Sequence, residues 1–128
     1  MLEIKEIQPS ETLDLRHRIL LPNKSVDSII LTEDDAEQHF GLFQSEKIVS
    51  VIPLFVENDN AQFRKFATET IEQHKGSGSI LLNHIIEESV KNNVKNLWCN
   101  ARLMALGFYE KFGFKVVSEK WIKMLLNM

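Results

Sequence analysis

The chain has 128 residues, 44% of them hydrophobic and 26% charged, which is typical of one globular domain spanning residues 1–128. Its formal net charge of -3 provides no basic field to attract nucleic acid or anionic lipid. The only cysteine, Cys99, excludes an internal disulfide, and no apolar run approaches the ~20 residues of a membrane helix. We therefore expect a cytoplasmic protein with no secretion signal, no membrane segment and no metal site.

The N-terminal part predicts a strand followed by a helix. Apolar residues within 2–7 indicate a short strand, and Ser10 is expected to cap a helix over residues 11–20, which Pro22 ends. Residues 25–38 show no clear hydrophobic period and are expected to be mostly loop.

The next segment predicts three antiparallel strands. The β-type runs 39–44 and 47–58 are separated only by Ser45 and Glu46, which is the spacing of a tight hairpin. After a short turn, residues 61–69 predict a third strand. Strands joined by such short links form an antiparallel meander.

The C-terminal half predicts a parallel crossover. Residues 79–92 have the clearest helical pattern, with one broad apolar face made by Leu81, Leu82, Ile85, Ile86 and Val90. Residues 95–100 form an apolar run typical of a buried strand, so the order strand, helix, strand predicts a right-handed parallel unit. A helix over 102–113, ended by Gly113, and one or two strands within 114–128 complete a mixed α/β sheet with helices on its faces.

The stretch "QHKGSGSILL", residues 73–82, places two glycines at the start of the clearest helix. The first amides of a helix have no partner within it, and the helix dipole adds partial positive charge there, so this end favours anions. Gly76 and Gly78 allow positive φ and close approach, and Lys75 adds a full charge, which suits a phosphate or pyrophosphate. The alternative is that the two glycines bind no ligand and only form a flexible connection between a strand and the helix. The pattern lacks the Lys-Ser/Thr ending of a P-loop and the third glycine of a dinucleotide motif.

Two motifs resemble those of one family. Gln73-x-x-Gly76-x-Gly78 is similar to the Gln/Arg-x-x-Gly-x-Gly/Ala signature of the GNAT N-acetyltransferase superfamily, in which the loop amides bind the pyrophosphate of coenzyme A. One helix and one strand further on, the chain matches the Ala-x-x-x-Tyr-x-x-x-Gly-Phe core of the same superfamily. The residues of this second match are Ala105, Tyr109, Gly113 and Phe114.

The resemblance implies the GNAT fold, which is a mixed and mostly antiparallel sheet with a splayed parallel strand pair and helices on both faces. It also implies acetyl-CoA as the acyl donor. In the family, pantetheine pairs with the strand before the glycine loop, here Ala67 to Glu69, whose N–H groups are also expected to polarise the thioester carbonyl. The implied coenzyme contacts are Ala67, Thr68, Glu69, Gln73, His74, Lys75, Gly76, Ser77, Gly78, Ser79, Asn100 and Tyr109.

Two of these residues have implied catalytic roles. The resembling segment makes Tyr109 the general acid, because a phenol of pKa about 10 is protonated at neutral pH and donates to a departing thiolate. The alternative is that Tyr109 has no catalytic role and is an ordinary helix tyrosine with a buried ring and a solvated hydroxyl. Glu69 is the first candidate for the base that deprotonates the amine, and His39 is the second, with a plain surface position as the alternative for both. Cys99 is expected to be a buried, inert thiol rather than an acyl carrier.

We therefore predict an N-acetyltransferase that passes an acetyl group directly, in a ternary complex, to the amine of a small molecule or of a protein. A homodimer is a further expectation. One alternative is an inactive acyl-CoA-binding sensor, which a C-terminal segment shorter than that of relatives favours. The other is a structural protein with no cofactor. Turnover with amines separates the enzyme from the sensor, and acetyl-CoA binding separates both from the structural protein.

Overall fold

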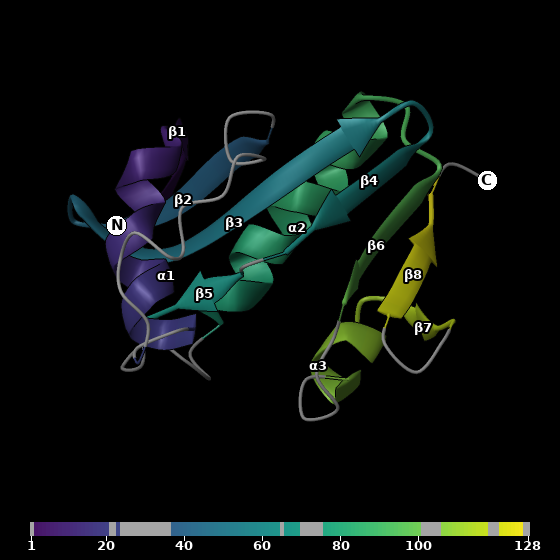
Figure 1. The fold of residues 1–128 in the computed structure, drawn as a ribbon. Coiled ribbons are helices and arrows are strands. Elements are labelled where there is room, and N and C mark those ends of the chain that lie inside the picture. Colours follow the sequence, from purple (N-terminus) through teal and green to yellow (C-terminus); the bar gives the residue numbers. More distant parts are fainter. Residues whose placement is uncertain are drawn as a thin grey trace.

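The computed structural model describes residues 2–20, 23, 37–64, 66–69, 76–100, 106–117 and 121–126. The strands are β1 (Leu2–Ile7), β2 (Gln38–Gln44), β3 (Lys47–Glu57), β4 (Asn60–Phe63), β5 (Ala67–Thr68), β6 (Asn96–Asn100), β7 (Lys115–Val116) and β8 (Trp121–Leu125). The helices are the 3-10 helix η1 (Pro9–Thr12), α1 (Leu13–Leu20), α2 (Ser77–Lys91) and α3 (Leu106–Glu110). The strands form one sheet in the order β1-β2-β3-β4-β6-β8-β7, and β5 pairs with β3 beside this path (Figure 1).

The two faces of the sheet carry different helices. On one face, α2 buries Leu81, Leu82 and Ile85 completely in the main core, and Figure 1 shows α2 behind β3 and β4. On the other face, Leu15 of α1 packs in a smaller core with Val51 and Ala67. The predicted mixed sheet with helices on both faces is confirmed.

The predicted hairpin is also confirmed. Ser45 and Glu46 have φ angles of 50° and 75°, and such left-handed conformations belong to a type I′ turn, whose twist matches that of the flanking strands. β2 then pairs along β3, with one β-bulge between Leu42 and Phe43. One edge of β3 is therefore occupied by β2, and its other edge is available to β4 and β5.

The predicted helix cap at Ser10 is wrong. The 3-10 helix η1 begins at Pro9, two residues before the predicted start, and Gln8 precedes it in an extended conformation. The Gln8 N–H donates to Glu11 Oε2 at 2.8 Å, and the Glu11 N–H donates to the Gln8 carbonyl oxygen at 3.0 Å. Proline suits the first position of a helix, because the N–H that it lacks would have no partner there. The start is thus determined by Pro9, and the α-helical hydrogen bonds begin only at Leu13.

The strand predicted over residues 61–69 is divided into two. Phe63 at the end of β4 lies opposite Leu54, whereas Ala67 at the start of β5 lies opposite Val51. Between these two pairs the sequence has three residues after Phe63 but only Ile52 and Pro53 on the β3 side, so the register shifts by one residue. An extra residue disrupts a ladder, and a proline has no N–H to donate to it. β4 and β5 consequently pair with β3 as two separate strands.

The predicted parallel crossover is confirmed, since residues 60–62 of β4 pair in parallel with residues 96–98 of β6 and α2 connects the two strands. The apolar face of α2 is narrower than predicted, because Val90 is 41% exposed whereas Ser89 is buried and donates its hydroxyl to the Ile85 carbonyl oxygen at 2.9 Å. Positions 81, 85 and 89 repeat at four residues along the buried stripe, so position 90 is turned about 100° away from it.

The C-terminal residues form two closing strands, as predicted. β8 lies between β6 and β7, with antiparallel pairing on both sides. Gly113 has a φ of 102° and lies three residues after the end of α3, where its N–H donates to the Glu110 carbonyl oxygen at 3.0 Å, which is consistent with its predicted role as a terminator. Most of the predicted loop 25–38, Pro22 and the first part of the predicted helix 102–113 lie outside the described residues. Within the described ranges, no helix has the length and apolarity needed to cross a membrane.

Substitutions at two positions of α2 test the narrower buried stripe. Ile85→Ala removes a completely buried side chain and is expected to lower the free energy of unfolding by about 2–5 kcal/mol. Val90→Ala, on the exposed flank, should lower it by less than about 1 kcal/mol. Urea denaturation followed by circular dichroism measures both. Equal losses at the two positions would contradict the burial pattern.

Candidate active site

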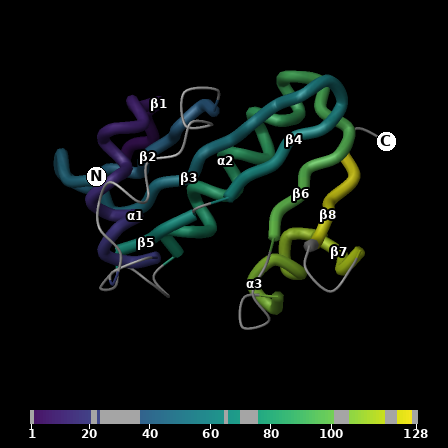
Figure 2. Tube along the Cα trace, viewed as in Figure 1, coloured from purple at the N-terminus to yellow at the C-terminus, as the bar shows by residue number. Residues whose placement is uncertain are grey.

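The sheet opens between β5 and β6. β6 pairs with β4 only at residues 96–98 and continues to Asn100 with β8 on its other edge, while β5 pairs with β3 and with no other described strand. The trace in Figure 2 shows β6 beside β4 and then diverging from β5. Two strand edges without a described strand partner therefore face this opening, and such edges are where an extended ligand can add its own hydrogen bonds.

The amides of β5 correct one prediction. The Glu69 N–H donates to the Val49 carbonyl oxygen at 2.7 Å, so it does not face the opening. Successive residues of a strand direct their backbone groups to opposite edges, which turns the Thr68 N–H toward the opening and that of Ala67 toward β3. Of the three amides expected to polarise the thioester carbonyl, only that of Thr68 has the required direction.

A buried hydroxyl pair fixes β5 against β3. Ser50 Oγ lies 2.8 Å from Thr68 Oγ1 and 3.2 Å from the Ala67 carbonyl oxygen, to which it donates. If Ser50 donates its one proton to that carbonyl, the proton in the hydroxyl pair must come from Thr68. Ser50 was not predicted to matter for the site. The signal in the sequence was a single serine within the otherwise apolar run of β3, and the structure shows that this serine is completely buried.

The N-terminus of α2 meets the opening with unpaired helical amides. Gly76 precedes the helix with a φ of 90°, and the first helical hydrogen bond runs from the Ile80 N–H to the Gly76 carbonyl oxygen at 3.0 Å. The N–H groups of Ser77, Gly78 and Ser79 therefore have no acceptor within α2, and the helix dipole favours an anion there. Gln73, His74 and Lys75, the other predicted contacts of this loop, lie outside the described residues.

Gly78 marks the place where three elements converge. A Cβ atom built on it would lie 3.4 Å from Phe66 Cζ, 3.8 Å from Phe108 Cζ and 3.8 Å from Thr68 Oγ1. A methyl group would fit at these distances, but a larger side chain would displace the two rings or the threonine. β5, α2 and α3 thus come together at one small residue, and sequence reasoning had not identified Phe66 or Phe108 as its neighbours.

Tyr109 lies on α3 with its ring in the main core and only 9% of its surface exposed. The ring centroids of Phe63, Phe108 and Phe114 lie 5.9, 5.2 and 5.8 Å from that of Tyr109. Burial raises the pKa of the Tyr109 hydroxyl above its usual value, and the neighbouring Cys99 raises it further. The hydroxyl is therefore protonated at neutral pH, as a proton donor must be.

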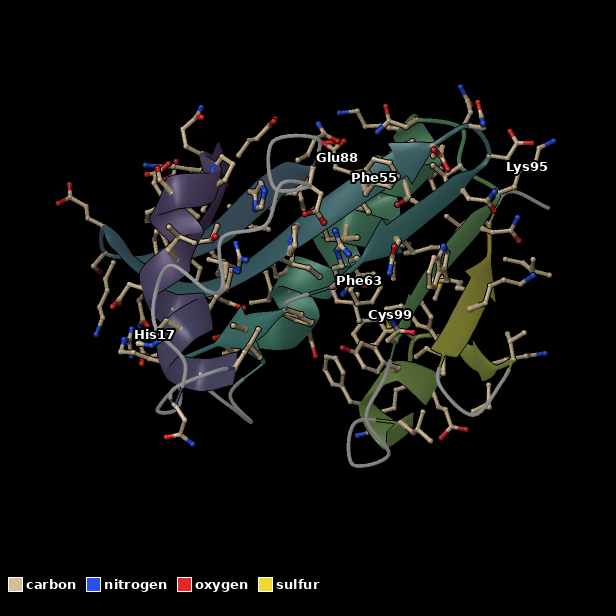
Figure 3. All side chains as sticks on the ribbon, viewed as in Figure 1. His17, Phe55, Phe63, Glu88, Lys95 and Cys99 are labelled. Carbon is tan, nitrogen blue, oxygen red and sulfur yellow. The ribbon has the colours of Figure 1, made fainter. Side chains whose placement is uncertain are left out.

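Cys99 is almost completely buried on β6, and burial raises its pKa to about 12. The thiol is neutral at physiological pH and a poor nucleophile, which agrees with the predicted inert role. Figure 3 shows Cys99 and Phe63 near the point where β4 and β6 separate. Asn100, the last residue of β6, is exposed at the same end of the strand.

Glu69 is held by an arginine from α1. Arg18 Nη1 and Nη2 donate to Glu69 Oε1 and Oε2 at 2.7 and 3.0 Å, and Arg18 Nε donates to Asp14 Oδ2 at 3.0 Å. The Arg18 hydrogen bonds lower the pKa of Glu69, which makes its carboxylate a weaker base than a free one. His39, the second candidate base, is buried on β2. No signal in the sequence connects Arg18 with Glu69.

No group of three potential metal ligands was found among the residues that the structure describes. The opening instead has the Thr68 amide at one strand edge and the N-terminus of α2, and α3, which bears the buried Tyr109, meets both elements at Gly78. These groups suit an extended ligand that carries an anion at one end and a reacting atom at the other.

Comparison with known proteins defines the class. The profile of the acetyltransferase (GNAT) domain matches residues 14–125. The uncharacterized N-acetyltransferase YitI of Bacillus subtilis strain 168 is 34% identical over 128 residues, which covers 93% of this chain and 86% of the relative. The ribosomal protein bS18-alanine N-acetyltransferase of Escherichia coli K12 is 33% identical over 79 residues, which is 59% of this chain and 53% of the relative.

Solved structures show the same fold. The E. coli ribosomal-protein-S18-alanine N-acetyltransferase gives a TM-score of 0.87 at 21% identity, with 100% of this chain and 96% of that chain covered. N-acetylglutamate synthase from Neisseria gonorrhoeae, complexed with coenzyme A and L-arginine, gives a TM-score of 0.78 at 16% identity, with 99% and 34% covered. The protein is an acyltransferase. It belongs to the GNAT acetyltransferase family, which confirms the predicted family and fold.

The ion pair between Arg18 and Glu69 predicts a pH-dependent contribution to stability. The folded-state pKa of Glu69 is lowered, so the stabilisation is present above the unfolded value of about 4.3 and is lost as pH falls through the lower folded value. Glu69→Gln is expected to lower the free energy of unfolding by about 1 kcal/mol at pH 7 and by less at pH 3. Urea denaturation at both pH values measures this difference.

Asp14→Asn is the matched control, because Asp14 binds the same arginine but its side chain is 80% exposed. Its effect should stay near zero at both pH values. A loss from Glu69→Gln that is the same at pH 7 and pH 3 would show that the ionised pair contributes nothing.

Proposed function

We propose that the protein is an acetyl-CoA-dependent N-acetyltransferase that transfers the acetyl group directly to an amine in a ternary complex. The observation that carries this proposal is the convergence at Gly78 of the β5 edge, the α2 N-terminus and the helix that bears Tyr109. One ligand seated in the opening can reach all three. The free, buried thiol of Cys99 suits a reducing cytoplasm, which is the location that we propose.

The residues at the opening fit coenzyme A. The amides of Ser77, Gly78 and Ser79 suit its pyrophosphate, because they have no acceptor within α2 and lie at the positive end of the helix dipole. The proposed loop contacts further include Gln73, His74 and Lys75, and the proposed strand contacts include Ala67, Thr68 and Asn100. The coenzyme A bound to the structurally similar N-acetylglutamate synthase supports this choice of ligand.

Acetyl-CoA, when bound, supplies the acetyl thioester. The Thr68 N–H, directed at the opening, orients and polarises its carbonyl group. The Tyr109 hydroxyl, kept protonated by burial, donates its proton to the departing thiolate. Because Arg18 makes Glu69 a weak base, we propose that water takes the proton of the acceptor amine and that Glu69 positions β5.

The acceptor that we propose is the amino group of a polypeptide. This choice is supported by the E. coli relative, whose name describes it as acting on an alanine of ribosomal protein bS18. A small-molecule amine is the alternative, and a panel of both kinds of acceptor, followed by thiol release, separates them. Peptides with an N-terminal alanine are the first acceptors to test.

Coenzyme binding is tested at Gly78. Gly78→Val is expected to weaken acetyl-CoA binding by about 10-fold or more, because the side chain occupies the space that Phe66, Phe108 and Thr68 surround. Gly107→Val on α3 is the matched control, since a Cβ there meets no atom within 4 Å. Isothermal titration calorimetry measures the dissociation constants, and circular dichroism verifies folding. Unchanged binding by folded Gly78→Val would exclude this placement of the coenzyme.

The acid role is tested by Tyr109→Phe, which removes the hydroxyl and keeps the ring packing with Phe63 and Phe114. We expect kcat to fall by about 100-fold or more while the dissociation constant for acetyl-CoA is unchanged. Thiol release in steady state measures kcat. Full activity of the variant would assign proton donation to another group, and acetyl-CoA binding without turnover by the parent would favour the sensor.

A further inference from the structure

A row of side chains crosses the face of the sheet opposite α2. Register places Gln62 of β4 beside Trp98 of β6, Trp98 beside Lys123 of β8, and Lys123 beside Lys115 of β7. Residues directly opposite one another on paired strands present their side chains on the same face. Phe55 of β3, labelled in Figure 3, extends the row by one strand. Figure 1 shows α1 at the other end of the sheet, away from β6 and β8.

This face is hollowed at its centre. A depression of about 470 Å³ is lined by Asn60, Asn96, Trp98 and Lys123. The Asn96 side-chain amide donates to Asn60 Oδ1 at 3.0 Å, which orients the two amides. Among the residues that the structure describes, the lining therefore contains an indole, an ammonium group and two amides, and no carboxylate.

The two lysines of the row make an unfavourable pair. Lys115 and Lys123 lie directly opposite one another, and like charges in that position destabilise a sheet. Neither has an ion-pair partner within the described ranges, whereas Lys91 and Lys95 each have a carboxylate within 4 Å. Glu57 occupies the same face but lies three strands from Lys123, about 14 Å away at normal strand spacing. An added anion beside the row would remove the repulsion.

The row lies at a defined distance from the opening. Measured back along β6 from Asn100 at the opening, Trp98 lies two residues away, about 7 Å, and Asn96 lies four residues away, about 13 Å. An extended polypeptide advances by about 3.4 Å per residue. A peptide whose amine lies at the opening therefore passes Trp98 and Lys123 about two to four residues later.

We propose that the open face of β4, β6, β8 and β7 binds the polypeptide acceptor and selects an acidic side chain two to four residues beyond the acetylated amine. The inference rests on the proposed function for the position of that amine. Lys123 and Lys115 bind the carboxylate, Trp98 packs against the peptide, and the Asn60–Asn96 pair offers amide groups to its backbone.

Binding of short peptides tests the proposal without requiring turnover. Two hexapeptides with a free N-terminal alanine and a fluorophore at the C-terminus carry either three Glu or three Gln at positions 3–5. Fluorescence anisotropy, with coenzyme A present and absent, is expected to show about fivefold tighter binding of the Glu peptide. Lys123→Gln and Lys115→Gln should remove most of this difference, and 0.5 M salt should reduce it.

Lys91→Gln is the matched control, because Lys91 lies on α2 on the other face and pairs with Glu88. It should leave the preference unchanged. Lys123→Glu with a peptide carrying three Lys should restore binding, which a general loss of structure would not do. Equal binding of the Glu and Gln peptides by the parent, or an equal loss with Lys91→Gln, overturns the proposal. A Glu preference without thiol release would support this surface while counting against the proposed function.

Discussion

The site depends on the interruption between β4 and β5. β3 has 11 residues and is long enough to pair with both strands, but its pairing with β4 stops at Leu54 and its pairing with β5 is confined to Ser50 and Val51. Pro53, between these two regions, has no N–H for the ladder. The chain resumes pairing as β5, displaced from the line of β4. β6 then follows β4 and not β5, so the sheet opens where the two separate. One missing hydrogen-bond donor and one additional residue thus lead to an opening that a continuous ladder would have closed.

A strand of two residues needs support from outside the ladder, and β5 receives it on both faces. Ser50 and Thr68 share a hydrogen bond on the α2 face, and Glu69 accepts two hydrogen bonds from Arg18 on the α1 face. Groups held in this way lose little entropy when a ligand binds, which is the advantage of a preorganised site. The Glu69 carboxylate, which the sequence predicts as a candidate base, instead has its oxygens engaged by Arg18 in this support.

Features that depend on neighbouring residues were predictable from the sequence. The Ser45–Glu46 turn and the helix near Gly78 follow from local spacing, and the structure places the turn as predicted and the start of the helix two residues before the predicted one. The motifs predicted the family that the domain profile identifies. Features that depend on distant partners were not. Arg18 and Glu69 are 51 positions apart, and the division of residues 61–69 follows from where Pro53 falls in the register of another strand. The exposure of Val90 likewise depends on how α2 meets the sheet.

The position of β8 has a consequence for folding during synthesis. β7 precedes β8 in the chain but lies outside it in the sheet, so β7 has no neighbour and β6 has a bare edge until residues 121–125 have left the ribosome. Ile122 and Met124 of β8 also cover the main core beside Phe114. A nascent chain that stops before β8 therefore leaves apolar surface accessible to chaperones, and the sheet is complete only once this last strand has been synthesised.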